Sequence, residues 1–272
     1  MRKLVLAGMV TVLACGGSNN SNNNNNNGTP GLKTFSYGSP AAPSAAQQQT
    51  ATTAQTQMNN AVKASVNGQV ANAASLPSMT DSLAASLPNL VATLPDPAAS
   101  SGGETASLLA HRSAGITQGC YTVSSTSITY NNCTIAGSGY SETINGTLAT
   151  SNGTVTWNLS VNYAYNASGV SSNGTYTWTG QLTGTSSTIV GQGRSSFNGS
   201  ASSNGTTYSY QYTAGFDANL TYQASPYCIT GGTLEIRRTL NSSTNSQAIP
   251  VHDAGAKYTW TGCNQVTVQV GN

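Results

Sequence analysis

Side chains that could do acid–base or nucleophilic chemistry are few in this sequence. It contains two histidines, one of which is followed directly by a carboxylate, as His252-Asp253. Neighbouring residues of a strand point to opposite faces of the sheet, so we do not expect this pair to form a catalytic dyad. No serine stands in a Gly-x-Ser-x-Gly motif, which would place a nucleophile on a sharp turn. The sequence therefore predicts no enzyme activity and no cofactor.

The first fifteen residues have the features of an export signal. Arg2 and Lys3 precede an uncharged, mostly apolar stretch, Leu4 to Ala14. As a helix it would span about 16 Å, too short for a hydrocarbon core of about 30 Å. The stretch ends in Val12-Leu13-Ala14-Cys15, which resembles the lipobox of bacterial lipoproteins. The resemblance implies cleavage before Cys15, diacylglycerol on its thiol, and acylation of the new amine.

A lipobox also implies where the protein resides and what it contacts. Several acyl chains together hold a protein stably on a membrane. By analogy with enterobacterial lipoproteins, Gly16 after the cysteine favours the outer membrane. We therefore expect a lipid-anchored protein of the bacterial cell envelope, on the periplasmic face or at the cell surface. Its expected partners are the membrane and either other envelope proteins or a hydrophobic ligand.

Four further cysteines lie in the second half of the chain. An even number in an exported protein suggests two disulfides, for which three pairings exist. We favour Cys120–Cys133 and Cys228–Cys263, because each would staple a hairpin. The alternative is a metal site, but no Cys-x-x-Cys spacing or nearby histidine supports it.

The second disulfide makes a prediction about strand register. If Cys228 faces Cys263, regular antiparallel pairing would place Leu234 opposite a residue of the wrong face. One extra residue between them restores Leu234 opposite Tyr258. We therefore predict a β-bulge at Gly231-Gly232, where glycine tolerates the bulge conformation.

Charge is scarce, and this excludes some partners. Removing Arg2 and Lys3 from the nine basic residues leaves seven, against seven acidic residues, so the mature net charge is about zero. Such a protein lacks the field that attracts nucleic acid. We interpret the adjacent basic pair Arg237-Arg238 as a solvated strand edge rather than a phosphate site.

Composition divides the chain into four segments. Residues 1–14 are the signal peptide, and residues 15–43 are an Asn-rich, Pro- and Gly-containing tether with too few apolar residues to bury a core. Residues 44–100 are a helical segment, and residues 101–272 are an antiparallel β domain.

The helical segment carries a narrow apolar stripe. Val62, Val66 and Val70 are spaced by four, and Thr80 is placed to cap a further short helix. Two interpretations remain open: short helices that lie on the β domain, or a lid over a ligand cavity.

Period-two alternation dominates the last part of the sequence. Apolar and polar residues alternate along residues 207–222, 155–165 and 266–270. The pattern predicts a mainly β fold: an antiparallel up-and-down meander of roughly nine to eleven strands. We expect a curved sheet, half-barrel or barrel, with one to three N-terminal helices packed on its apolar face. If that face holds a hydrophobic ligand, the expected lining residues are Trp157, Trp178, Tyr208, Tyr212 and Phe216.

Asn-Gly dipeptides punctuate the alternating runs. Both residues tolerate the positive φ that a type I′ hairpin turn needs. We predict hairpin turns at Asn152-Gly153 and Asn173-Gly174, and interpret the other Asn-Gly pairs as bulges or looser bends.

Three functions fit these features. The first is a structural or surface lipoprotein, adhesive or part of an envelope assembly, whose apolar face is ordinary core. The second is a carrier of lipid or another hydrophobic ligand; its shape would be similar to lipoprotein-carrier half-barrels at the level of architecture alone. The third is a glycan-binding module that uses exposed aromatic rings.

Overall fold

The computed structural model describes most of the chain after the expected signal and tether. Cys15, His111 and the sequence around the expected domain boundary lie outside the described residues. The described residues are 31–85, 87, 119–137, 139–167, 170–203, 205–244 and 252–271.

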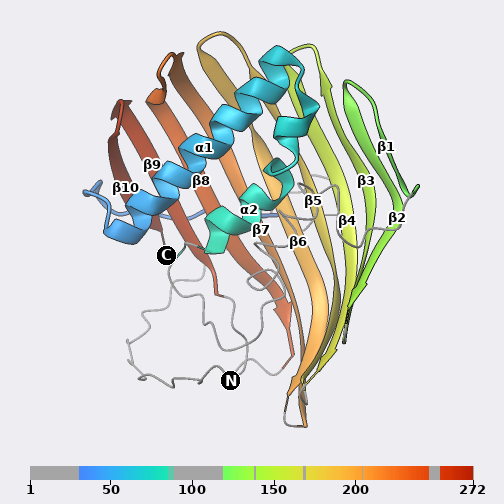
Figure 1. Ribbon diagram of the computed structural model, residues 1–272. Helices are drawn as coiled ribbons and strands as arrows, with labels where there is room; N and C mark the ends of the chain where they lie inside the picture. Colours follow the sequence, from blue (N-terminus) through green and yellow to red (C-terminus); the bar gives the residue numbers. More distant parts are fainter. Residues whose placement is uncertain are drawn as a thin grey trace.

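The described residues form a single antiparallel sheet with two α-helices and a short 3-10 helix on one face (Figure 1). Every strand pairs with its neighbours in sequence, from β1 to β10, and the sheet is open because β1 and β10 are edges. The predicted up-and-down meander is therefore confirmed, as an open sheet rather than a barrel. The strands are β1 (Tyr121–Val123), β2 (Ser127–Gly137), β3 (Tyr140–Ser151), β4 (Thr154–Ala167), β5 (Val170–Gly184), β6 (Thr188–Ser203), β7 (Thr206–Ala224), β8 (Tyr227–Ser243), β9 (Ala254–Gly262) and β10 (Gln265–Gly271).

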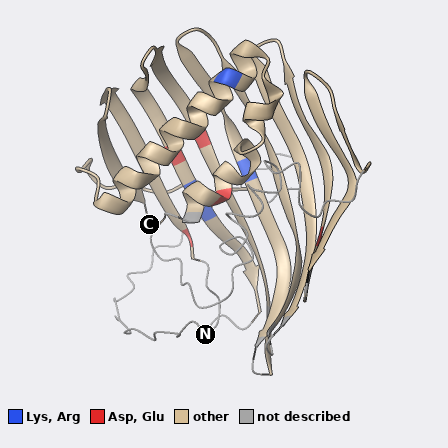
Figure 2. Ribbon diagram, viewed as in Figure 1, with Lys and Arg blue, Asp and Glu red and all other residues tan. Residues whose placement is uncertain are grey.

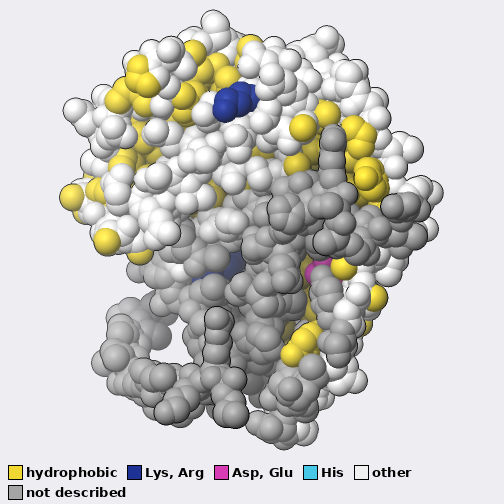
Figure 3. All heavy atoms as spheres, viewed as in Figure 1, with side chains coloured by type: hydrophobic (Ala, Val, Ile, Leu, Met, Phe, Trp, Pro, Cys, Tyr) yellow, Lys and Arg dark blue, Asp and Glu magenta, His cyan; other side chains and the backbone are white. Residues whose placement is uncertain are grey.

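Alternation along each strand separates an inner face, which carries the helices, from an outer face. On β7 every second residue from Tyr210 to Tyr222 is buried on the inner face. Few positions on the ribbon are charged (Figure 2). On the helix-covered side the described surface is mostly uncharged, with apolar side chains in small groups (Figure 3).

One of the two predicted Asn-Gly hairpins is confirmed. Asn152 and Gly153 connect β3 to β4 with φ of 49° and 74°, the left-handed values of a type I′ turn. The prediction at Asn173-Gly174 is wrong, because both residues lie inside β5. Glycine is needed there for space: a Cβ on Gly174 would lie 2.6 Å from the Phe197 ring on the neighbouring strand.

Both favoured cysteine pairings are found. Cα–Cα distances are 5.1 Å for Cys120–Cys133 and 5.5 Å for Cys228–Cys263. Leu234 pairs with Tyr258, as the parity argument requires. On β7 the adjacent residues Thr221 and Tyr222 pair with Gly231 and Ile229 of β8, so the pairing skips Thr230. Thr230 is therefore the extra residue of the bulge, immediately before the predicted Gly231-Gly232.

The helices are α1 (Ala45–Asn67), the short 3-10 helix η1 (Val70–Ala73) and α2 (Leu76–Ala85). A capping box between Ser44 and Gln47 starts α1, and Gly68 ends it in the left-handed conformation. Figure 1 shows α1 crossing the sheet obliquely, with α2 beside it.

The predicted valine stripe is confirmed only in part, because Val62 and Val70 are buried but Val66 is not. Val66 is 44% exposed, and Val70 belongs to η1. Each step of four residues rotates about 40° around a helix, so such a stripe leaves the buried face. The buried face of α1 includes Ala51, Ala54 and Met58 together with Val62. Thr80 is not a cap either: it is buried in the middle of α2.

Residues 31–43, the end of the expected tether, lie against the sheet. We call them the N-terminal strap. The Gly38 N–H donates to the Val270 carbonyl at 3.1 Å, and the Ala41 N–H donates to the Val268 carbonyl at 3.0 Å. The strap thereby covers the edge of β10 before the chain turns to the inner face and begins α1.

Before it reaches that edge, the strap crosses the outer face. Leu32 and Phe35 lie over Gly215 and Gly255, where an added Cβ would come within 2.4 Å and 3.0 Å of their side chains. Because these glycines lack a Cβ, they leave room on the outer face for two apolar side chains of the strap.

Candidate functional site

The predicted ligand-lining residues lie together on the inner face. Trp157 on β4, Trp178 on β5, and Tyr212 and Phe216 on β7 are all buried. The backbone of Tyr208 lies on the same face of β7, but its side chain is outside the described set. The structure therefore groups the described members of the set beneath the helices.

Phe197 is the centre of this aromatic layer, and sequence analysis missed it. Its ring centroid lies 4.7 Å from that of Tyr176 and 5.0 Å from that of Tyr210. Trp178 stacks on Tyr176 at 5.5 Å with an interplanar angle of 7°. Phe197 stands among glycines and serines on β6, so no aromatic alternation marks it. The signal that could have found it is its spacing from buried Ile189, because the numbers of two positions on the same face of a strand differ by an even number.

Aromatic rings of this layer lie across glycines of neighbouring strands. Gly180 pairs with Trp157, and a Cβ there would lie 2.2 Å from the indole Cζ2. Gly193 pairs with Phe216, with a corresponding distance of 2.3 Å to Cε1. The rings therefore occupy the volume that side chains at these positions would take.

Two polar groups attach α2 to the aromatic layer. Asp81 accepts hydrogen bonds from the Trp178 indole N–H and from the Ser195 hydroxyl, the latter at 2.5 Å. Arg238, only 2% exposed, donates to the Ala84 carbonyl at 2.8 Å, near the C-terminal end of α2. A cation at this end of a helix is favourable because carbonyl groups converge there.

The interpretation of Arg237-Arg238 as a solvated edge is wrong. The two side chains point to opposite faces of β8, which is an interior strand, so Arg238 is buried beneath α2 and Arg237 lies on the outer face. Only the outward arginine enters the charged network described next.

A charged network lies on the outer face of β6, β7 and β8. Asp217 accepts from Arg194 Nη2 at 2.7 Å and also pairs with Arg237. Glu235 lies 3.5 Å from Arg237 and accepts a hydrogen bond from the Tyr37 hydroxyl at 2.6 Å. Burial, reinforced by the bond to Glu235 and its negative charge, raises the pKa of Tyr37. Tyr37 therefore stays a donor that ties the strap to the network.

Asp253 is engaged elsewhere than with its neighbour His252. Its carboxylate pairs with Lys33 of the strap and accepts the Leu240 N–H at 2.7 Å. The His252 side chain is exposed, and its backbone carbonyl accepts from Arg238 at 3.0 Å. Asp253 thus serves to hold the strap and strand β8.

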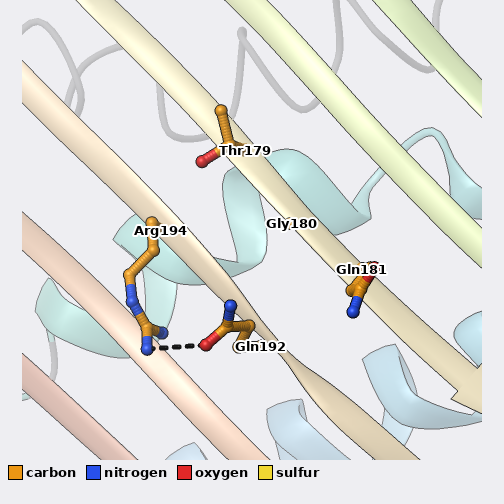
Figure 4. Close-up of a pocket in the computed structure, with 5 residues that line it drawn as sticks. All are labelled: Thr179, Gly180, Gln181, Gln192 and Arg194. Atoms are coloured by element: carbon orange, nitrogen blue, oxygen red, sulfur yellow. Dashed lines mark hydrogen bonds between the residues drawn. The ribbon is translucent and has the colours of Figure 1, made fainter. Parts of the chain in front are cut away.

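A polar pocket of about 300 Å³ opens on the outer face between β5 and β6. Figure 4 shows Thr179 and Gln181 on one strand, with Arg194 and Gln192 turned toward each other on the next. Arg194 Nη2 donates to Gln192 Oε1 at 3.0 Å. Gly180 completes the lining. These residues occupy polar positions of alternating strands, so nothing in the sequence distinguished them from an ordinary solvated face.

Two other kinds of site are absent from the described residues. Among them, no three His, Cys, Asp or Glu side chains gather as metal ligands. No helix in this part of the chain is both long enough and apolar enough to cross a bilayer.

The comparisons with known proteins give no relative. No family model, curated protein or solved structure matches this chain.

Proposed function

We propose that this chain is a lipoprotein of the bacterial cell envelope, anchored through Cys15, whose β domain has a structural or adhesive role without catalysis. One observation supports a structural role for the inner face. Its aromatic rings lie on glycines of neighbouring strands and beneath the helices, as the pairs Trp157–Gly180 and Phe216–Gly193 illustrate. Side chains packed this closely act as a core.

The proposed anchor rests on residues 12–15 and fits the position of the strap. Residues 16–30 would link Cys15 to the first described residue, and a flexible link of that length spans about 20 Å. The β domain would then sit close to the membrane, with outer-membrane placement inferred from Gly16.

Labelling with radioactive palmitate tests the anchor. We expect the native protein to be labelled and Cys15→Ala to abolish the label, because the acylated thiol is lost. Ser18→Ala is the matched control and should leave labelling intact. Labelling that persists in Cys15→Ala would refute the anchor.

A second candidate, a carrier of a hydrophobic ligand, is favoured by the attachment of α2. Asp81 links this helix to Trp178 and Ser195, so departure of α2 would uncover aromatic surface. Natively purified protein should then carry a co-purifying lipid detectable by mass spectrometry. Asp81→Ala should also raise the uptake of a fluorescent fatty acid severalfold. Lipid-free protein with no uptake in either form would remove this candidate.

A further inference from the structure

We propose that the outer-face pocket between β5 and β6 binds a neutral carbohydrate through Gln181, Gln192 and Thr179. This site goes beyond the proposed structural role and does not depend on the anchor at Cys15. It also differs from a glycan site built on exposed aromatic rings, because the predicted aromatic residues with described side chains are buried.

The pocket is formed by two successive cross-strand pairs. Thr179 pairs with Arg194, and Gln181 pairs with Gln192. Neighbouring strands are about 4.8 Å apart, and residues two apart on a strand are separated by about 6.7 Å. Four polar side chains therefore stand at the corners of a rectangle with the footprint of one sugar ring. Gly180, which pairs with Gly193, lies between the two cross-strand pairs and contributes its backbone to the lining.

The donor side of Gln192 is oriented by its neighbour. Because Arg194 donates to Gln192 Oε1 at 3.0 Å, the amide NH₂ group points away from the guanidinium and is free to donate. Arg194 is itself held by the Phe216 carbonyl and by Asp217, each at 2.7 Å. This arrangement fixes one amide before a ligand arrives, which lowers the entropy cost of binding.

Charge and surroundings favour a neutral polyhydroxylated ligand. Asp217 balances the charge of Arg194, so a phosphate or carboxylate would meet an anion beside the one cation among the described lining residues. Amide and hydroxyl groups both donate and accept, as sugar hydroxyls require. Val190, 45% exposed and two residues before Gln192 on the same face, offers an apolar contact for C–H groups.

The polar surface continues beyond the pocket. On β4, Asn158 pairs with Thr179, and Thr156 pairs with Gln181. These uncharged side chains extend both rows across the outer face, so the site suits an oligosaccharide better than a single sugar.

Nuclear magnetic resonance of side-chain amides tests the site. The full-length protein is titrated with cellohexaose, maltohexaose and the hexamer of N-acetylglucosamine, and with the acidic hexamer of galacturonic acid. We expect at least one neutral oligosaccharide to shift the Gln181 and Gln192 NH₂ signals saturably. Gln192→Ala and Gln181→Ala should each weaken that binding roughly three- to tenfold, the loss of one or two net hydrogen bonds.

The matched control is Gln211→Ala. Gln211 lies on the outer face of β7, pairs with Asn198 and is outside the pocket. It should leave affinity unchanged, and circular dichroism checks that all three variants remain folded. The proposal is overturned if none of the neutral hexamers shifts these signals at millimolar concentration. It is overturned equally if Gln211→Ala weakens binding as much as Gln192→Ala, or if only the acidic hexamer binds.

Discussion

Gly180 and Trp157 show how single residues define the inner face. A Cβ at position 180 would meet the indole at 2.2 Å and the Gln192 carbonyl oxygen at 2.7 Å. We predict that Gly180→Val lowers the free energy of unfolding by about 1–3 kcal/mol or more, because the core cannot accept the added volume. Urea-induced unfolding of the variant and of the unsubstituted protein measures this difference in the free energy of unfolding.

A control and a rescue make this prediction specific. Gly38→Ala should change stability by less than about 0.5 kcal/mol, since its nearest new neighbour is 3.8 Å away. In a double-mutant cycle, Trp157→Leu should offset part of the cost of Gly180→Val. Simple additivity of the two substitutions would show that the ring is not the obstacle.

Tyr130 gives a prediction about alkaline stability. Burial, with a smaller contribution from Tyr121, raises the pKa of Tyr130 from 10.0 to about 12. The folded state thus favours the neutral phenol: its contribution is complete below pH 10 and is lost as pH rises toward 12. We predict a loss of roughly 2–3 kcal/mol over this interval from Tyr130. Urea unfolding of Tyr130→Phe should show a shallower decline above pH 10, and identical declines would contradict the assignment.

At the scale of elements, the strap protects a sheet edge. Exposed edge strands readily pair with other chains. A protein that begins at Gly31 should remain monomeric, whereas one that begins at Ala42 loses the three backbone hydrogen bonds between the strap and β10. We predict that the shorter protein is less stable and self-associates with rising concentration, as measured by sedimentation velocity. If the two proteins have the same stability and the same sedimentation behaviour, the strap does not protect the edge of β10.

The two disulfides should differ modestly in their contribution. They join residues separated by 13 and 35 positions. Loop-closure entropy then predicts stabilisation of roughly 3 kcal/mol for Cys120–Cys133 and roughly 4 kcal/mol for Cys228–Cys263. Two variants, each with both cysteines of one disulfide changed to serine, are compared by their free energies of unfolding. A larger loss of stability on removing Cys120–Cys133 than on removing Cys228–Cys263 would argue against an entropic origin.

At the scale of the whole molecule, the inward face of the strands and both disulfides were predictable, whereas the packing of individual rings and of the helices was not. The alternation around Phe216 correctly placed one face inward. The requirement that Cys228 face Cys263 while Leu234 faces Tyr258 correctly predicted one extra residue, a bulge, between them. The prediction at Asn173-Gly174 failed because a glycine can mark either a turn or a position where an aromatic ring needs room. Only the position of the Phe197 ring on the neighbouring strand distinguishes the two. The valine spacing was only partly informative, because alanine and methionine supply most of the buried face of α1 and Val66 is exposed.

The candidate site was partly predictable for the same reason. Trp157 and Trp178 reveal themselves by alternation within their own strands. The pocket residues Gln181 and Gln192 come from two strands, and their convergence depends on register. The strap was assigned to the tether because its composition is polar, whereas its attachment depends on partners such as Glu235 that lie about two hundred positions away.

Attachment of the strap to β10 has a consequence for biogenesis. Among the described elements, the first to emerge from a ribosome or an export channel is the partner of the last. The central hairpins can form in order as they appear, but the strap has no β10 to join until the carboxyl-terminal residues have arrived. Completion of the fold is thereby delayed until nearly the whole chain has emerged, and a product truncated before β10 would leave the strap without the strand that it pairs with.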